Sequence, residues 1–180
     1  MIELRKAQLS ESDEILNFYR NTIFAISDSE FQPKWNDRYP DLEFIKNSIL
    51  KEELYVYSQK NIAACVVINS ELSEEYGNVK WHVNAQPDEI IAIHTFAVSS
   101  IGKGIGKGIF DYIVKKAIEN DKKAIRIDVI DGNVGAQKVF EKFGFEYVDS
   151  VEMFHEAVGL ETFHLYEKAL KKEVGVKEPL

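Results

Sequence analysis

The chain has 180 residues, of which 45% are hydrophobic, 12% aromatic and 29% charged, and its 30 acidic and 22 basic residues leave a net charge of −8. This length corresponds to one domain with a sizeable core, and the composition excludes a disordered or fibrous protein. An acidic balance of this size argues against non-specific binding to nucleic acid or to an anionic membrane surface.

The sequence also lacks the signals of several other protein classes. The longest apolar run, Ile62–Ile68, is much shorter than the roughly 20 residues of a transmembrane helix, and the first ten residues contain no apolar signal-peptide core. The single cysteine, Cys65, lies inside that run, so we expect a small buried hydrophobe and no disulfide. No metal site is predicted, because no His and carboxylate residues have ligand spacing. A cytoplasmic protein is expected.

The first half of the chain is predicted to contain both strands and helices. In chain order these are a strand at residues 2–5, a helix from the N-cap Ser10 through Ile23, a helix at 42–49, and strands at 53–58 and 62–69. Residues 70–88 are polar, and a segment of this length inside a compact domain is more often functional than idle.

The second half is also predicted to contain both strands and helices. Its predicted elements are a strand at residues 90–98, a helix at 105–117, a strand at 124–130, a helix at 136–143 that Gly144 ends, and strands at 145–154 and 162–167. This order predicts an α/β fold in which one mixed sheet carries helices on both faces. We expect one domain over residues 1–170 and a frayed tail at 171–180.

A glycine cluster carries the most specific functional signal. The segment 97–110, AVSSIGKGIGKGIF, lies between a predicted buried strand and a helix, and it carries Lys103 and Lys107. Glycine permits close backbone approach, and a helix N-terminus offers free N–H groups to an anion, so a phosphate or pyrophosphate site is predicted. The spacing fits neither a Walker A loop nor G-x-G-x-x-G; it fits x-x-G-x-G at Gly104 and Gly106. A glycine-rich turn without a ligand is the alternative.

Together with the segment 126–148, RIDVIDGNVGAQKVFEKFGFEYV, the cluster resembles the GNAT superfamily of acyl-CoA-dependent N-acyltransferases. The first motif of that family is [Q/R]-x-x-G-x-[G/A], and the second is N-x-x-A-x-x-[L/V]-[Y/F]-x-x-x-G-F. The second is matched here by Asn133, Ala136, Val139, Phe140, Gly144 and Phe145. The resemblance implies one mixed, mostly antiparallel sheet of about seven strands flanked by about four helices.

The resemblance also implies acetyl-CoA as the acyl donor and a set of residues that bind it. Backbone groups of Phe96, Ala97 and Val98 would pair with the pantetheine arm. Backbone amides would hold the pyrophosphate, and they come from Gly102, Lys103, Gly104, Ile105, Gly106 and Lys107. The pantetheine and thioester would be flanked by Asn133, Ala136 and Phe140.

The sequence departs from the family pattern at two places. Ile101 stands at the Gln/Arg position, in a loop about two residues shorter than the common form, and binding there depends mainly on backbone N–H groups. Phe140 stands where many relatives carry a Tyr that protonates the departing thiolate, and a phenyl ring donates no proton. An N-acetyltransferase that acts by direct attack in a ternary complex is therefore predicted, with a slow or non-catalytic CoA-binding module as the alternative.

The acceptor is expected to be a small-molecule or peptide amine, and the protein to be a monomer or homodimer. His94 is the candidate base, expected on the same strand face as Phe96; a hydrogen-bonded core histidine is its alternative. Candidate substrate-binding residues are Glu30, Trp35, Tyr39, Trp81 and His82. A set of acids is expected to border the acceptor and favour a cationic amine, unless it only aids solubility: Asp28, Glu30, Asp37, Glu71, Glu74, Glu75 and Asp88.

Overall fold

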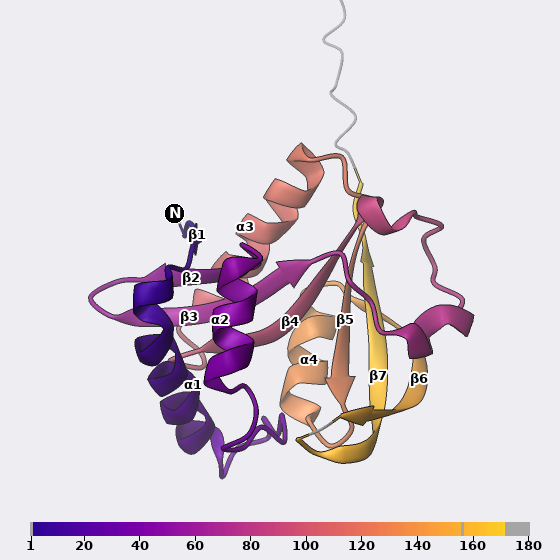
Figure 1. Ribbon diagram of the computed structural model, residues 1–180. Coiled ribbons are helices and arrows are strands. Elements are labelled where there is room, and N and C mark those ends of the chain that lie inside the picture. Colours follow the sequence, from indigo (N-terminus) through magenta and orange to yellow (C-terminus); the bar gives the residue numbers. More distant parts are fainter. Residues whose placement is uncertain (1, 156, 172–180) are drawn as a thin grey trace, which may run out of the picture.

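The computed structural model describes residues 2–155 and 157–171, and in this part of the chain seven strands form one sheet (Figure 1). The strands are β1 (Arg5–Lys6), β2 (Leu54–Ser58), β3 (Ile62–Asn69), β4 (Ile90–Val98), β5 (Ala124–Ile130), β6 (Glu146–His155) and β7 (Gly159–Ala169). Their order is β1-β2-β3-β4-β5-β7-β6; β4 and β5 pair in parallel and the other neighbours are antiparallel. The predicted fold class is confirmed.

Four α-helices in the described residues cover the two faces of the sheet. They are α1 (Ser12–Ile26), α2 (Leu42–Leu50), α3 (Ile105–Glu119) and α4 (Val134–Lys142). Helices α1 and α2 pack together on one face and α3 and α4 lie on the other (Figure 1). Residues 172–180, where the sequence predicts most of the frayed tail, lie outside the described residues.

Strand bounds agree with the sequence prediction where apolar character is strong, as in β3, β4 and β5, and differ at the ends of the chain. Ser10 is not the N-cap of α1 as predicted, because a 3₁₀ turn at Leu9–Glu11 precedes that helix. The Glu11 carboxylate accepts the Gln8 backbone N–H at 2.9 Å, so a capping box starts this turn. The last strand extends beyond the predicted 162–167 because it pairs with both β5 and β6.

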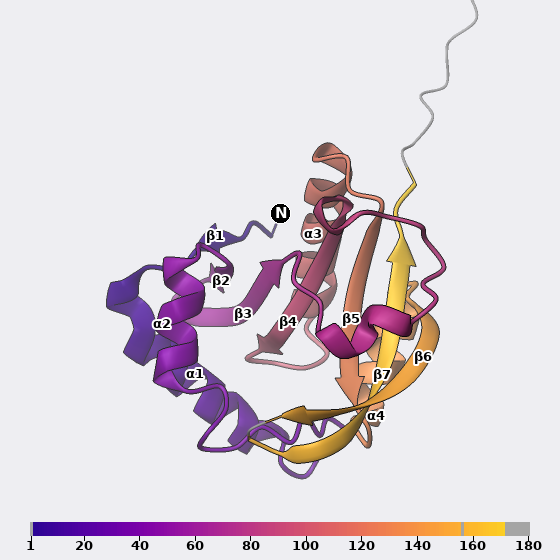
Figure 2. The ribbon, with the colours of Figure 1, turned by 45° about the vertical axis from the view of Figure 1, so that its right-hand side comes forward.

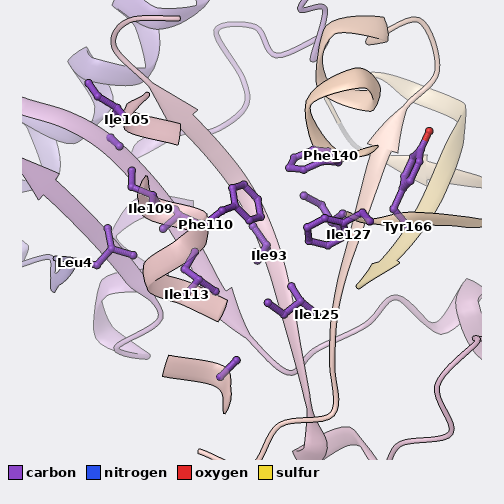
Figure 3. Close-up of a cluster of buried hydrophobic side chains, with 14 of the residues drawn as sticks. Leu4, Ile93, Ile105, Ile109, Phe110, Ile113, Ile125, Ile127, Phe140 and Tyr166 are labelled. Atoms are coloured by element: carbon purple, nitrogen blue, oxygen red, sulfur yellow. The ribbon is translucent and has the colours of Figure 1, made fainter. Parts of the chain in front are cut away.

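The sheet separates two hydrophobic cores. The core on the α3/α4 face is centred on Phe110 (Figure 3). The centroid of its ring lies 5.2 Å from that of Phe96 and 5.4 Å from that of Phe140. The core on the α1/α2 face contains Ile15, Tyr19 and residues of β2 and β3. Burial of these side chains supplies the driving force for assembling helices on both faces.

The sheet splits near its middle, where β4 and β5 separate. Their parallel pairing covers Ile90–Ile93 against Ala124–Ile127 and does not continue to the ends of the two strands. In Figure 1 the two arrows diverge toward their carboxyl ends. A split of this kind opens a space between two strands that is bounded by backbone on both sides.

A β-bulge in β4 accompanies the split. Cys65 pairs with Ala97 but Val67 pairs with His94, so β4 holds one more residue than β3 in this interval. Thr95, inside the bulge, has a φ of +44°, which is unusual for a β-branched residue. The buried Tyr19 hydroxyl donates a hydrogen bond of 2.8 Å to the Thr95 carbonyl and holds it in place.

The bulge reverses the alternation of side chains along β4. Ile93 and Phe96 both belong to the core under α3, whereas Val67, the pairing partner of His94, belongs to the core under α1 and α2. Directly opposed residues in a sheet share a face. The prediction that His94 and Phe96 share a face is therefore wrong, because one inserted residue shifts the register by one.

The β6–β7 hairpin curls under the split and meets the segment between α1 and α2 (Figure 2). The Asn36 side-chain amide donates to the Ala157 carbonyl at 3.0 Å, and the ring of Tyr39 lies edge-on to His155 at 4.5 Å. These contacts connect the two halves of the molecule across the separated ends of β4 and β5.

Candidate active site

A cavity of about 690 Å³ lies where β4 and β5 separate. Its walls come from α1, the α1–α2 segment, β4, the glycine loop, α3, β5, α4 and the β6–β7 hairpin. His94 and Phe96, which point to opposite faces of the sheet, both line it. The cavity therefore passes through the split and joins the two sides of the sheet, which is the arrangement a two-substrate reaction needs.

The glycine loop forms one end of this cavity. Gly102 and Gly104 have φ values of +83° and +77°, and a Cβ at either position would meet no atom within 4 Å. Gly104 is the N-cap of α3, and its carbonyl accepts the first helical bond, from the Gly108 N–H at 3.0 Å. The preceding N–H groups of the first turn have no main-chain acceptor, and the turn contains no acidic residue.

This end of the cavity fits an elongated anion. The free N–H groups and the positive end of the α3 dipole face an open cradle, and Lys107 lines the cavity beside them although its ammonium also contacts Asp111 at 2.6 Å. Beyond the loop, the hydroxyl of Thr95 is buried and has no hydrogen-bond partner among the described residues. A ligand that runs from the loop into the split would pass Thr95, which lines the cavity.

Most of the predicted cofactor residues line the cavity. These are Phe96, Val98, Gly102, Gly104, Gly106, Lys107, Asn133, Ala136 and Phe140. Ala97 is instead buried in the core under α1, and the side chain of Ile105 is buried under α3; Lys103 is exposed. Lys142, which the sequence analysis did not single out, also lines the cavity.

Asn133 has partners within the fold that the sequence did not predict. Its side-chain oxygen accepts the Gln32 N–H at 2.9 Å and the Ala136 N–H at 3.4 Å, so it caps α4 and ties the α1–α2 segment to that helix. The Gly135 N–H donates to the carbonyl of Glu30 at 2.8 Å. The Glu30 carboxylate does not line the cavity; it pairs with Lys138 at 2.6 Å.

Phe140 lies in the wall of the cavity and is 6% exposed. Its ring packs edge-on against Phe110 and Phe145. The site therefore presents carbon where many relatives present a hydroxyl. Tyr112 and Tyr166 also carry phenols that could donate a proton, but they do not line the cavity.

His94 is oriented by a short hydrogen-bond chain. The Asn69 amide donates to Glu53 at 3.2 Å, and its oxygen accepts the Glu71 N–H at 3.0 Å, which fixes the orientation of the amide. His94 Nε2 lies 3.0 Å from the same oxygen and must therefore be the donor. In the neutral ring the lone pair is then on Nδ1, which has no hydrogen-bond partner among the described residues.

Asp128 and Tyr76 form a polar pair on the acceptor side that sequence reasoning missed. The Tyr76 hydroxyl donates to Asp128 Oδ2 at 2.7 Å, and both residues line the cavity. Burial, followed by the Asp128 charge, raises the pKa of the Tyr76 phenol well above its usual value and does the same for Tyr39. Both phenols are therefore protonated at neutral pH. The available signal was a carboxylate within the largely apolar strand that also carries Arg126.

Trp81 and His82 do not reach this cavity. Trp81 lies over the Arg126 guanidinium at 4.3 Å, and Arg126 forms a buried ion pair of 2.9 Å with Glu167. The His82 ring contacts the Tyr147 carbonyl at 3.0 Å. These contacts hold the 70–89 segment against the sheet, so Trp81 and His82 stabilise the fold and do not contact the cavity. Trp35 and Tyr39, in contrast, line the cavity.

The acids expected to border the acceptor do not line the cavity; among the described residues Asp128 is the carboxylate that does.

Cys65 is fully buried, and burial raises the pKa of its thiol above the ordinary value. In the described part of the chain, no group of His, Cys, Asp and Glu is placed to hold a metal ion, and no helix is long and apolar enough to cross a membrane.

Several solved structures with a similar architecture are named as acetyltransferases. A Staphylococcus aureus Mu50 protein assigned as an acetyltransferase is 26% identical, with a TM-score of 0.67 over 94% of this chain and 99% of that chain. A GNAT-family acetyltransferase of Streptococcus agalactiae 2603 is 22% identical, with a TM-score of 0.71 over 95% and 96%. A Salmonella typhimurium protein, solved with its cofactor acetyl-CoA, is 14% identical, with a TM-score of 0.63 over 100% and 98%.

The sequence assigns this fold to a family. The profile of the acetyltransferase (GNAT) family matches residues 20–145, and the chain belongs to that family. It is therefore an acyltransferase of a family that uses acetyl-CoA as acyl donor. No curated protein matches this chain closely enough to count as a relative.

Proposed function

We propose that this protein transfers an acetyl group from acetyl-CoA to a primary amine by direct attack within a ternary complex. The observation that carries the proposal is the cavity through the split sheet, with the glycine loop at one end and His94 in the wall facing the other. Two reactants that enter from opposite sides would meet between the ends of β4 and β5. Such alignment is itself a large part of catalysis in a bimolecular reaction.

On the donor side, first-turn amides of α3 and the loop glycines would hold the diphosphate. The edge of β4 from Phe96 to Val98 would lie along the pantetheine arm, because β5 does not pair with this part of the strand. The apolar wall of Ala136 and Phe140 would exclude water from the acyl group. Bound acetyl-CoA supplies an acyl carbon activated as a thioester with a thiolate leaving group.

On the acceptor side, His94 Nδ1 would take a proton from the amine nitrogen, whose lone pair then becomes available. The ring is suited to this because Asn69 holds the Nε2 proton and leaves Nδ1 as the acceptor. The bulge at Thr95 takes backbone amide groups of β4 out of the regular ladder, and an amide released in this way can donate to a developing oxyanion.

Phe140 supports a second candidate function, a CoA-binding module with slow or no chemistry. The phenyl ring cannot protonate a departing thiolate, and loss of one general acid costs roughly 10²–10⁴-fold or less in rate. Thiol release from acetyl-CoA over a panel of amines separates the two. Acceptor-dependent release supports the enzyme, whereas tight CoA binding without any such release supports the module.

Asn69→Leu tests the role of His94 while leaving the histidine itself in place. The substitution removes the oxygen that holds the Nε2 proton, so we expect kcat to fall by about tenfold with an unchanged KM for acetyl-CoA. His94→Ala should alter the pH–rate profile in addition. If both variants kept the wild-type profile and kcat, His94 would have no part in proton transfer.

A further inference from the structure

The acceptor end of the cavity is a largely aromatic chamber. Rings line it from the α1–α2 segment, the 70–89 segment and the β6–β7 hairpin: Phe31, Trp35, Tyr39, Tyr76, Phe154 and His155. Apolar side chains of α1 and the hairpin, including Ile26, Met153 and Val158, complete the walls. A surface of this kind binds a flat, apolar body better than a heavily hydrated one.

One carboxylate lies in this chamber. Asp128 is half-buried on the face of β5 opposite to the α3 core, and its Oδ2 accepts the Tyr76 hydroxyl at 2.7 Å. Tyr76 is 6% exposed, so its ring position is set by packing and the carboxylate is held in turn. Asp128 Oδ1 has no hydrogen-bond partner among the described residues and is available to a ligand.

Positive charge at the cavity is restricted to the donor side. Among the described residues, the cations that line it are Lys107 on α3 and Lys142 on α4, both on elements that form the donor end. Among the described residues, the acceptor chamber offers no Lys or Arg to a second carboxylate or a phosphate on the acceptor, and no carboxylate besides Asp128 to an additional ammonium group.

We propose that the acceptor is an arylalkylamine: one primary ammonium group bound by Asp128, carried on a flat aromatic body that fills the chamber. This inference rests on the proposed function, since it names the acceptor class for the same site. A polyamine would bring an additional ammonium group for which the described residues supply no second carboxylate, and an amino acid would leave its carboxylate without a cation. An amino sugar would leave several hydroxyls without partners, and each unpaired polar group lowers affinity.

A panel of matched amines tests the acceptor class. With acetyl-CoA as donor, thiol release is measured for 2-phenylethylamine, phenylalanine, spermidine and glucosamine. Phenylalanine differs from 2-phenylethylamine only by a carboxylate, and we expect its kcat/KM to be lower by about 100-fold because that group finds no cation. If phenylalanine, spermidine or glucosamine equalled or exceeded 2-phenylethylamine, the inference would be wrong.

Substitutions test whether Asp128 binds the ammonium group and whether Phe154 contacts the aromatic body. Asp128→Asn keeps the shape and removes the charge, and we expect KM for 2-phenylethylamine to rise by about tenfold or more. The matched control is Asp149→Asn on β6, because Asp149 is exposed, lies outside the cavity lining and should leave KM unchanged. Phe154 is 70% exposed, so Phe154→Ala should fold normally and lower kcat/KM for 2-phenylethylamine about threefold or more relative to propylamine.

The outcomes separate this inference from the proposed function. CoA binding is measured by calorimetry on each variant, and it should be unaltered in Asp128→Asn, which also reports that the variant is folded. If no amine in the panel released thiol although CoA bound, the proposed function itself would fail. If thiol release occurred but Asp128→Asn and Asp149→Asn behaved alike, only the assignment of Asp128 as the ammonium site would be overturned.

Discussion

Gly106→Asp provides a sharp test of the donor site, because it should stabilise the free protein while weakening CoA binding. Gly106 is the second residue of α3, and a Cβ there would lie 3.9 Å from the Phe96 ring, an ordinary contact. An aspartate in the first turn interacts favourably with the helix dipole, and Asp has a higher helix propensity than Gly. Together these effects should raise the free energy of unfolding by about 1 kcal/mol.

The same carboxylate should repel the diphosphate of CoA. At a separation of about 6 Å and an effective dielectric constant of about 20, two unit charges repel by about 3 kcal/mol, which corresponds to roughly a 100-fold loss of affinity. Gly106→Asn is the matched control, since it has the same size without the charge. If CoA affinity falls in Gly106→Asp but not in Gly106→Asn, the loss is caused by the negative charge at this position.

Two measurements are needed. Calorimetric titration with CoA at low and moderate salt gives the affinity, and denaturant unfolding of the free protein gives its free energy of unfolding. The affinity difference between Gly106→Asp and Gly106→Asn should shrink as salt rises, because ions screen the repulsion. Wild-type CoA affinity in Gly106→Asp, with a stable fold, would refute the placement of the diphosphate at the N-terminus of α3.

Two further predictions concern the elements that hold the site together. Gly135→Ala should lower the free energy of unfolding by about 1–3 kcal/mol in spite of better helix propensity, because its Cβ would lie 2.9 Å from the Phe31 ring; Gly77→Ala, with no atom within 4 Å, is the control. Denaturant unfolding checks this, and equal stabilities would contradict it. Tyr19→Phe should cost about 1–2 kcal/mol by leaving the Thr95 carbonyl unpaired, and an unchanged midpoint would show that the bulge does not depend on this bond.

Local sequence patterns predicted the elements that position the donor. The apolar run at residues 90–98 gave the bounds of β4, and the glycine cluster marked the start of α3 at Gly104. These predictions succeeded because burial on both sheet faces and positive φ values leave strong signals in the residues themselves. Chain ends were less accurate: the first strand is Arg5–Lys6, since pairing with β2 determines which residues join the sheet.

The acceptor side could not be predicted in this way. His94 faces away from Phe96 because a bulge at Thr95 inserts one residue, and nothing in the local alternation announces that insertion. Trp81 lies outside the cavity because the ion pair between Arg126 and Glu167, residues distant in sequence, anchors its segment elsewhere.

The sequence alone determined that this chain is an acidic, single-sheet α/β protein, and its motifs assigned it to an acyltransferase family; it also predicts a pyrophosphate site at the glycine loop. Tertiary structure decided which charges matter at the cavity. The −8 balance suggested acids around the acceptor, yet the acids named from sequence position do not line the cavity, and Asp128 does. The physical reason is that the charge of a residue follows from its type alone. Whether that charge lies at the cavity depends on which strands separate and which side chains the split exposes.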